Sequence, residues 1–274
     1  MKIKIGFACD SYEKKQEEEA IPITEIPRSI APRKSLVQVE FPGRAMSLAY
    51  YNDKFDLRVG DFVYVEGKLE GKRGRVIDVN YNFKIKISDY MRVIALVDTS
   101  VKGQFHYAGS HFVTFDRNAI PAEKVVRWFM APSKDDDEFI SGSDDTAFRL
   151  DDLTSMKISV DVAKRGHDYY MENKVVYVSI DGTRGYAIVE GSRPYEVEFE
   201  YQNGEISHLT CSCFCSYNCK HEFAAMLQLR ETLEKIEKNY AAEYERTGYF
   251  VAISKGTLFS FAIDGNDVGS FTLN

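Results

Sequence analysis

A sixteen-residue run, 211–226, constrains the fold of this chain more than any other stretch, because cysteines and a histidine are concentrated in it. Its first eleven residues hold four of the five cysteines and one of the five histidines. Thiolates and neutral imidazoles are the ligands of tetrahedral zinc sites. Cys211 and Cys213 are two residues apart, and Cys219 and His221 have the same spacing, so each pair suits chelation. We expect the first pair on one face of a strand and the second at the start of a helix.

The spacing of these candidates resembles that of the SWIM-type zinc finger: Cys-x-Cys, five residues, Cys-Lys-His, then small apolar residues. The resemblance extends from about residue 155 to 230, through Gly166–Tyr170, a strand at Val175–Ile180 and the segment Val189–Val197. It implies a sheet before the cysteines and a long helix after them. It also implies one structural zinc ion, held by Cys211, Cys213, Cys219 and His221.

Cys215 leaves one alternative open for the ligand set. In that alternative, Cys215 replaces Cys211 and pairs with Cys213 before a shorter loop to Cys219. The five-residue gap matches the family better, so we predict that Cys215 is a spare thiol. Redox chemistry and a disulfide scaffold are both disfavoured as roles for the cluster. A redox Cys-x-x-Cys motif is absent from the run, and a disulfide scaffold would require a secreted protein.

The residues before the cluster predict a hairpin. Between 195 and 202, aromatic and apolar residues alternate with glutamates and a glutamine, so one face of the strand is buried and the other is acidic. Asn203-Gly204 then lies between two alternating runs, which is a strong hairpin signal. We expect this hairpin to deliver the strand that carries Cys211.

The residues after the cluster predict one long helix. Apolar residues recur every three or four positions as far as Tyr244, and Gly248 follows where a helix C-cap belongs. We expect the helix over about 219–247 and a hairpin over 249–274.

From Ser35 onward, short apolar runs separated by glycine turns predict a small β-barrel. The phrases LRVGDFVYVEG and GKRGRVIDV resemble those of SH3-like barrels, including KOW-type modules. One of the expected strands is 83–87, where Phe, Ile and Ile alternate with two lysines. We assign residues 35–130 to the barrel and an extension of it.

Charge is distributed unevenly along the chain. The net charge is −7, which argues against a protein that coats nucleic acid. Residues 31–100 nevertheless carry +3, whereas 151–230 carry −4. The basic segment therefore supplies the candidate nucleic-acid-binding residues, which are five cations and one ring able to stack on a base. They are Lys72, Arg73, Arg75, Lys84, Lys86 and Tyr81.

Composition also predicts the domain order. Residues 1–34 combine an alternating strand with a charged, proline-spaced arm, and an acidic linker is expected at 131–150. The SWIM-type domain would then cover 151–248. The fold class we expect is α+β: a small SH3-like β-barrel domain followed by a β-sheet and long-helix zinc-finger domain.

Nothing in the sequence predicts a membrane or secreted protein. No run approaches the ~20 apolar residues of a membrane helix, and the first apolar patch is too short for a signal peptide. Clustered cysteines without such a signal indicate a reducing compartment. We expect a cytoplasmic protein.

The sequence shows no catalytic constellation. Three cysteines and a histidine close the metal shell, whereas a catalytic zinc keeps an open position. His167 and Asp168 are adjacent, so on a strand they would point to opposite faces. We expect a protein that is not an enzyme and has no small-molecule substrate. The resemblance to SWIM-type domains implies an interaction module, and we expect a protein–protein adaptor in a nucleic-acid-associated complex. The alternative is direct binding of DNA or RNA by the basic face of the barrel.

Overall fold

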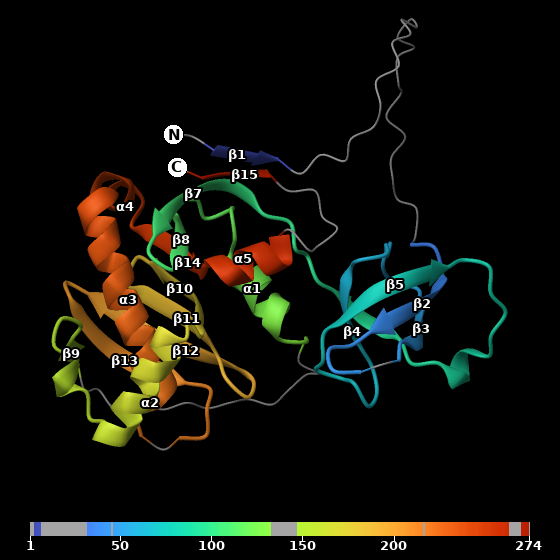
Figure 1. Cartoon of the computed structure of the whole chain (residues 1–274), viewed down its shortest axis with the longest axis horizontal. Coiled ribbons are helices and arrows are strands. Elements are labelled where there is room, and N and C mark those ends of the chain that lie inside the picture. The colour runs from blue at the N-terminus through green and yellow to red at the C-terminus, as the bar shows by residue number, and fades with distance from the viewer. Residues whose placement is uncertain are drawn as a thin grey trace, which may run out of the picture. The chain divides into compact units, whose positions relative to one another are not determined.

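The structure is a computed structural model of the 274-residue chain, and it describes residues 3–6, 32–44, 46–132, 147–215, 217–262 and 270–273. The described residues form a mixture of helices and strands, as expected for an α+β protein (Figure 1). The chain divides into two compact units. The smaller unit is residues 6–97, and the larger combines 1–5 with 98–274. The smaller unit is therefore an insertion into the larger one.

The smaller unit is a five-stranded sheet that closes on itself. Its strand order is β3-β2-β5-β4-β6, and the neighbouring strands are antiparallel. A single bridge between Tyr51 of β3 and Arg92, just before β6, joins the two edges of the sheet. The strands are β2 (Ser35–Glu40), β3 (Leu48–Asn52), β4 (Phe62–Val65), β5 (Gly74–Asn80) and β6 (Val93–Leu96).

Alternation along β2 builds the core of this unit. Val37 and Val39 are fully buried, and Phe41 follows them into the same apolar cluster. Gly74 on β5 lies so close that an added Cβ would collide with the side chains of Val39 and Phe41. The apolar period of two in the sequence thus predicts this strand correctly.

The prediction of a strand at 83–87 is wrong. β5 ends at Asn80, whose side chain accepts a hydrogen bond from the Asn82 amide at 2.8 Å and turns the chain out of the sheet. The following residues have no strand partner, and a short 3₁₀ helix, η1 (Ile87–Asp89), follows them. Phe83 instead packs edge-on against Tyr51, with ring centroids 6.2 Å apart.

The larger unit is built on a ten-stranded sheet of order β1-β15-β7-β8-β14-β10-β11-β12-β13-β9. β15 runs parallel to β7, and every pair from β7 along to β9 is antiparallel. The strands are β1 (Ile3–Gly6), β7 (Lys102–Ala108), β8 (His111–Thr114), β9 (Phe148–Arg149), β10 (Val175–Asp181), β11 (Arg184–Glu190), β12 (Pro194–Gln202), β13 (Glu205–Cys211), β14 (Tyr249–Ser254) and β15 (Ser270–Leu273).

The barrel extension predicted for residues up to 130 belongs instead to this larger unit. β8 pairs with β14, and the helix α1 (Ala122–Phe129) follows β8 along the chain. Trp128 of α1 stacks on Phe261 at 4.6 Å, and its indole N–H donates to the Asp98 carbonyl at 2.7 Å. We predicted a domain boundary near residue 130, but the two units meet in the sequence at 97/98. The reason is that a strand of the predicted extension, β8, pairs with β14 of the large sheet.

Helices cover both faces at the centre of the large sheet. α3 (Lys220–Asn239) packs across β10 to β13 with α2 (Val160–Met171) beside it, as Figure 1 shows. Successive strand residues point to opposite faces. Accordingly, Val113 of β8 joins the cluster beneath α3, whereas its neighbour Phe112 contacts Phe259 of α5 (Lys255–Ala262).

The sequence did not predict α2. Its N-cap is Ser159, whose hydroxyl accepts a hydrogen bond from the Val162 amide. Gly166 lets α2 approach α3, because an added Cβ would lie 2.8 Å from the Phe223 ring and 2.9 Å from the Lys220 carbonyl oxygen. His167 and Asp168 thus lie on a helix, and the strand argument applied to them does not hold.

The single helix expected over 219–247 is two helices. α3 ends at Asn239, Tyr240 caps it with φ of −143°, and α4 (Ala241–Thr247) follows. The Tyr240 hydroxyl donates to the Tyr107 carbonyl at 3.1 Å, and its ring lies 4.8 Å from that of His106. These contacts with β7 stabilise the break between α3 and α4. Gly248 ends α4 in the left-handed region with φ of 59°, as predicted.

The hairpin expected over 249–274 is also wrong. β14 is followed by α5, and Ser254 begins this helix because its hydroxyl accepts from the Thr257 amide at 3.2 Å. Residues 263–269 lie outside the described part of the chain. So do most of the predicted arm (7–31) and most of the predicted linker (133–146), although β9 at the end of that linker pairs with β13.

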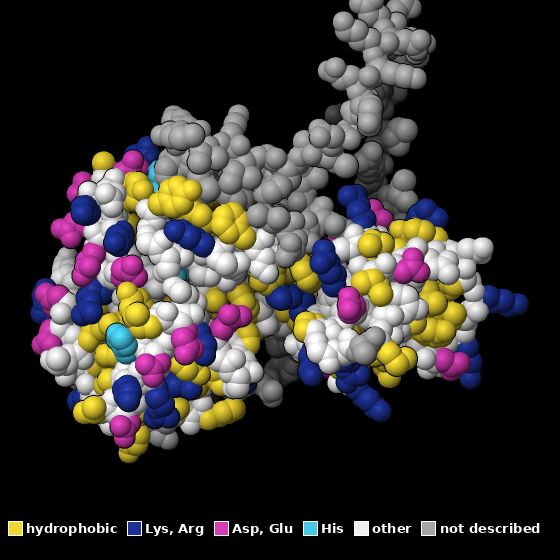
Figure 2. Space-filling view, viewed as in Figure 1, with side chains coloured by type: hydrophobic (Ala, Val, Ile, Leu, Met, Phe, Trp, Pro, Cys, Tyr) yellow, Lys and Arg dark blue, Asp and Glu magenta, His cyan; other side chains and the backbone are white. Residues whose placement is uncertain are grey.

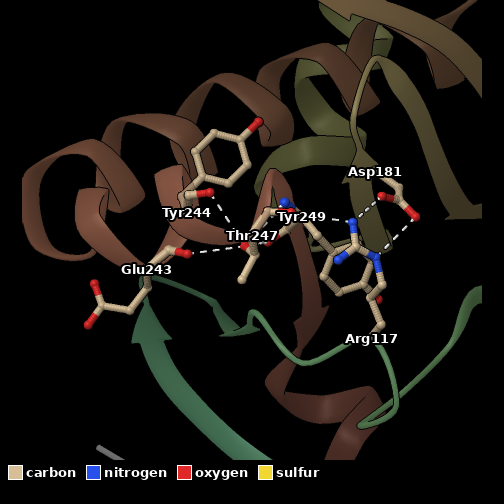
Figure 3. A network of polar contacts seen from close by, with 6 residues as sticks. All are labelled: Arg117, Asp181, Glu243, Tyr244, Thr247 and Tyr249. Carbon is tan, nitrogen blue, oxygen red and sulfur yellow. Dashed lines mark hydrogen bonds and ion pairs between the residues drawn. The ribbon is translucent and has the colours of Figure 1, made fainter.

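Arg117, in the loop after β8, connects three distant segments of the larger unit (Figure 3). Its guanidinium pairs with Asp181 at 2.5 Å, donates to the Thr247 carbonyl at 3.3 Å and lies over the Tyr249 ring. The Thr247 hydroxyl in turn donates to the Glu243 carbonyl at 3.1 Å. The end of α4 is thereby fixed against the β10–β11 turn.

Candidate metal centre

The hairpin β12–β13 carries the first metal-ligand candidate, as predicted. Asn203 and Gly204 form its turn with φ of 52° and 84°, the positive values that a two-residue turn of this type needs. Val197 of β12 pairs with Cys211, the last residue of β13. The strand ends there, so Cys213 reaches the cluster through the following loop and does not lie on the strand face that we expected.

The start of α3 carries the other two candidates. Cys219 is the N-cap residue, and its sulfur accepts a hydrogen bond from the Glu222 amide at 3.5 Å. The Glu222 carboxylate accepts from the Cys219 amide at 2.7 Å, which completes a capping box. His221 is the second residue of the helix. The helix N-terminus therefore places a sulfur and an imidazole next to one another.

The four predicted ligand atoms are close together. The potential ligand atoms of Cys211, Cys213, Cys219 and His221 all lie within 4.8 Å of one another. Nδ1 of His221 is 3.7 Å from the Cys211 sulfur and 3.6 Å from the Cys219 sulfur. In a tetrahedral zinc site the bond lengths give a sulfur–nitrogen separation of about 3.6 Å. The donor set therefore fits one metal ion, and Nδ1 is the imidazole nitrogen that faces the sulfurs.

The protonation chemistry of the cluster agrees with this fit. The hydrogen bond with Cys211, together with burial, raises the pKa of Cys219, and burial raises the pKa of Cys213. Burial lowers the pKa of His221 to about 4, so the imidazole is neutral and available as a ligand. Several thiolates cannot ionise side by side without a cation between them. A divalent metal ion supplies that charge.

Two tyrosines fix the plane of the His221 ring. Tyr195 of β12 stacks on it with centroids 3.9 Å apart and an interplanar angle of 18°. Tyr169 of α2 meets it edge-on at 5.5 Å. Nε2 of His221 is buried and has no hydrogen-bond partner among the described residues. The sequence places Tyr195 on the buried face of its strand, but an alternating pattern gives no sign that this ring would support a metal ligand.

Cys215 lies outside the four-residue set. It is exposed, whereas Cys219 is buried and Cys211 and Cys213 are half-buried. Burial and, to a smaller extent, the nearby Cys215 side chain raise the pKa of Cys213. The geometry therefore supports the predicted ligand set, with Cys215 beside it as a spare thiol.

The cations predicted to bind nucleic acid do not form one cluster. Arg73 and Arg75 lie near the start of β5, and both guanidinium groups lie over the Phe62 ring, at 5.1 and 5.7 Å. Lys84 and Lys86 follow the other end of β5, about 20 Å along a seven-residue strand. Figure 2 shows Lys and Arg side chains dispersed over the visible face of this unit.

The Tyr81 ring, which we predicted to stack on a base, already makes contacts within the smaller unit. The guanidinium of Arg33 lies 4.1 Å from the centroid of the Tyr81 ring, and the Tyr81 hydroxyl donates to the Leu57 carbonyl at 3.5 Å. The ring is 39% exposed. Lys72 is exposed in the turn before β5. The structure thus places the six predicted residues at separate positions on the smaller unit.

Comparisons with models of protein families, with curated proteins and with solved structures found no match. No helix in the described ranges is long and apolar enough to cross a membrane. The fold and the site together define a mixed helix and sheet protein with a four-residue Cys and His cluster suited to one metal ion.

Proposed function

We propose that this chain is a zinc-stabilised interaction module of the SWIM type that acts as a protein–protein adaptor in a nucleic-acid-associated complex, most simply in the cytoplasm. The observation that carries the proposal is the Cys211, Cys213, Cys219 and His221 set at tetrahedral spacing. Three thiolates and one imidazole fill the shell of a zinc ion and leave no position for substrate. The site therefore has a structural role, and the protein acts by binding rather than by catalysis.

A metal ion held by these residues would cross-link β13 to the start of α3. Structural zinc sites contribute about 10–16 kcal/mol of apparent binding free energy, as much as the whole stability of many domains. That energy would fix a loop whose sequence, SCFCSYN, cannot form a core of its own. The zinc ion thus stabilises one conformation of this surface loop, and an adaptor needs a surface of defined conformation.

The outer face of β12 is the docking surface that we propose for the partner. Glu198 and Glu200 are exposed, and Glu196 accepts a hydrogen bond from the Tyr186 hydroxyl at 3.0 Å. The buried residues of β12, Val197 and Phe199, face the cluster beneath α3, so these glutamates point away from it. An acidic sheet face of this kind suits a partner with basic side chains.

The distal half of α3 offers a comparison surface for the experiment. Glu234 and Glu237 are exposed there, so reversing them changes the net charge of the protein by the same amount as reversing Glu198 and Glu200. Zinc content should first be measured on the purified protein, with about one ion per chain expected. Proteins retained from the native cell extract should then be compared with and without nuclease.

We expect Glu198→Lys with Glu200→Lys to lose the retained partner, and Glu234→Lys with Glu237→Lys to keep it. Retention that survives nuclease treatment marks a protein partner. If the helix variant loses the partner and the sheet variant keeps it, the docking surface is α3. A partner lost only on nuclease treatment would contradict the adaptor function.

A further inference from the structure

The loop between Cys213 and Cys219 exposes two aromatic side chains that the metal site does not use. Phe214 is 89% exposed and Tyr217 is 86% exposed, the highest values among the large hydrophobic side chains described. Both ends of this short loop are held by metal-ligand candidates. The exposed rings are therefore presented from a fixed support, which makes them a candidate contact surface.

Phe214 ends a series of ring and cation contacts that begins at the metal site. The Tyr195 ring stacks on His221 at 3.9 Å. The Arg193 guanidinium lies 5.3 Å from the Tyr195 centroid and 5.2 Å from that of Phe214. We call His221, Tyr195, Arg193 and Phe214 the ring–cation column. Its outer end is an aromatic ring with most of its surface open to solvent.

Backbone contacts hold the column in place. Arg193 donates to the Ser212 carbonyl at 2.9 Å, and the Ser212 amide donates to the Glu196 carbonyl at 2.9 Å. Gly191 lets Tyr195 approach, since an added Cβ would lie 2.9 Å from the Tyr195 ring. The column thus spans β12, the loop and the start of α3.

Two cations, Arg193 and Lys220, lie beside the column. The loop residues 212–218 include no charged side chain. Arg193 has no carboxylate partner in the described part of the chain. Lys220, the residue before His221, is held beside the site by a 2.7 Å hydrogen bond from its ammonium to the Tyr169 hydroxyl. An open ring with free guanidinium N–H groups beside it suits an unpaired base and its phosphate.

We propose that Phe214 stacks on an unpaired base of single-stranded nucleic acid, with Arg193 contacting the adjacent phosphate. All the residues of this site belong to the larger unit. The site is also independent of the acidic β12 face, so the adaptor function can fail while this site stands. The interaction is sequence-tolerant, because every base presents a planar face.

The test uses tryptophan fluorescence in the full-length, zinc-loaded protein. Trp128 is the only tryptophan and is fully buried, so Phe214→Trp adds one exposed reporter at the end of the column. Val160→Trp is the matched control, because Val160 is 84% exposed at the far end of α2 from Tyr169. Each variant is titrated with an oligothymidylate of about twelve nucleotides. We expect quenching of Phe214→Trp and none of Val160→Trp.

A second variant separates base stacking from general hydrophobic contact. Phe214→Leu keeps an apolar side chain but removes the planar face, and it should bind a labelled oligothymidylate about tenfold or more weakly than wild type. Because one or two phosphates are contacted, affinity should fall by only about 0.7–1.4 log units per decade of salt. Absence of quenching, equal binding by Phe214→Leu, or a salt slope of about 3 or more would overturn the proposal.

Discussion

The two units differ sharply in the chemistry available to hold them together. Residues 32–97 contain no cysteine and no histidine, whereas residues 98–274 contain all five histidines and the four clustered cysteines. The smaller unit depends on an apolar cluster inside a closed sheet. The larger unit has its own apolar cluster beneath α3 and, in addition, a metal-ligand set at the end of one hairpin. Metal removal and acid should therefore affect only one of the two units.

Metal removal should give the largest difference between the units. Chelation takes away up to about 10–16 kcal/mol of binding free energy from the larger unit and none from the smaller. Hydrogen exchange should therefore accelerate at residues 205–225, while amides of β2 and β5 keep their protection. A metal-free protein with unchanged exchange and an unchanged cooperative melt would contradict a structural role for the metal.

The next prediction concerns the individual sulfurs. Ser at position 211, 213 or 219 should abolish stoichiometric zinc binding, because each change removes one of the four ligands. Cys215→Ser is the matched control, and it should retain about one zinc per chain because that thiol lies outside the set. Zinc analysis of the four purified variants decides between the sulfurs. Zinc lost from Cys215→Ser but kept by Cys211→Ser would reverse the assignment.

Acid should destabilise the larger unit through His111. Its ring is fully buried between the Val175 carbonyl at 2.7 Å and the Ser110 hydroxyl at 2.9 Å, and burial lowers its pKa to about 4. Below about pH 6.5 the unfolded chain binds a proton that the folded chain does not. Stability is therefore complete above that pH and falls by up to about 3 kcal/mol as the pH approaches 4.

Urea unfolding of the zinc-loaded protein at pH 7 and pH 5 measures this effect. His111→Gln should reduce the pH dependence of the larger unit, whereas His167→Gln, at an exposed position on α2, should leave it unchanged. The smaller unit has no histidine and should lose little stability over the same range. An equal loss in both units would show that other groups dominate.

The smallest effects come from a matched pair of glycines, one in each unit. An added Cβ would strike the Phe199 ring at Gly185 and the Val39 and Phe41 side chains at Gly74. Each alanine variant should lower the stability of its own unit by about 1–3 kcal/mol, the usual cost of overpacking. Gly256→Ala is the control, because nothing lies within 4 Å of the added atom. Thermal melts that assign either loss to the wrong unit would contradict the two-unit division.

Local patterns in the sequence predicted the parts of the fold that depend on neighbouring residues. The alternation on β2, the Asn203-Gly204 turn and the left-handed Gly248 each follow from the preferences of a few adjacent side chains. The four metal-ligand candidates could also be predicted from the sequence, because their residue types and spacing all lie within eleven residues. The structure brings those four together as predicted.

The errors arise where distant segments decide the outcome. β8 pairs with β14, whose residues follow more than a hundred positions later, so no local pattern assigns β8 to the large sheet. Tyr240 interrupts a helical periodicity because it is drawn to Tyr107 on β7. Ser254 begins a helix where we expected a hairpin. The stack of Tyr195 on His221 likewise needs a strand and a helix to be in place first.

The position of β1 bears on the order in which this protein can fold during synthesis. β1 precedes the inserted unit in the sequence, and its neighbour in the sheet is β15, which follows every other described strand. The inserted unit has only local pairings and can fold as soon as it leaves the ribosome. The larger sheet, in contrast, stays incomplete at its β1 edge until β15 has been synthesised. Removal of β15 by truncation would therefore leave β1 without its neighbour among the described strands.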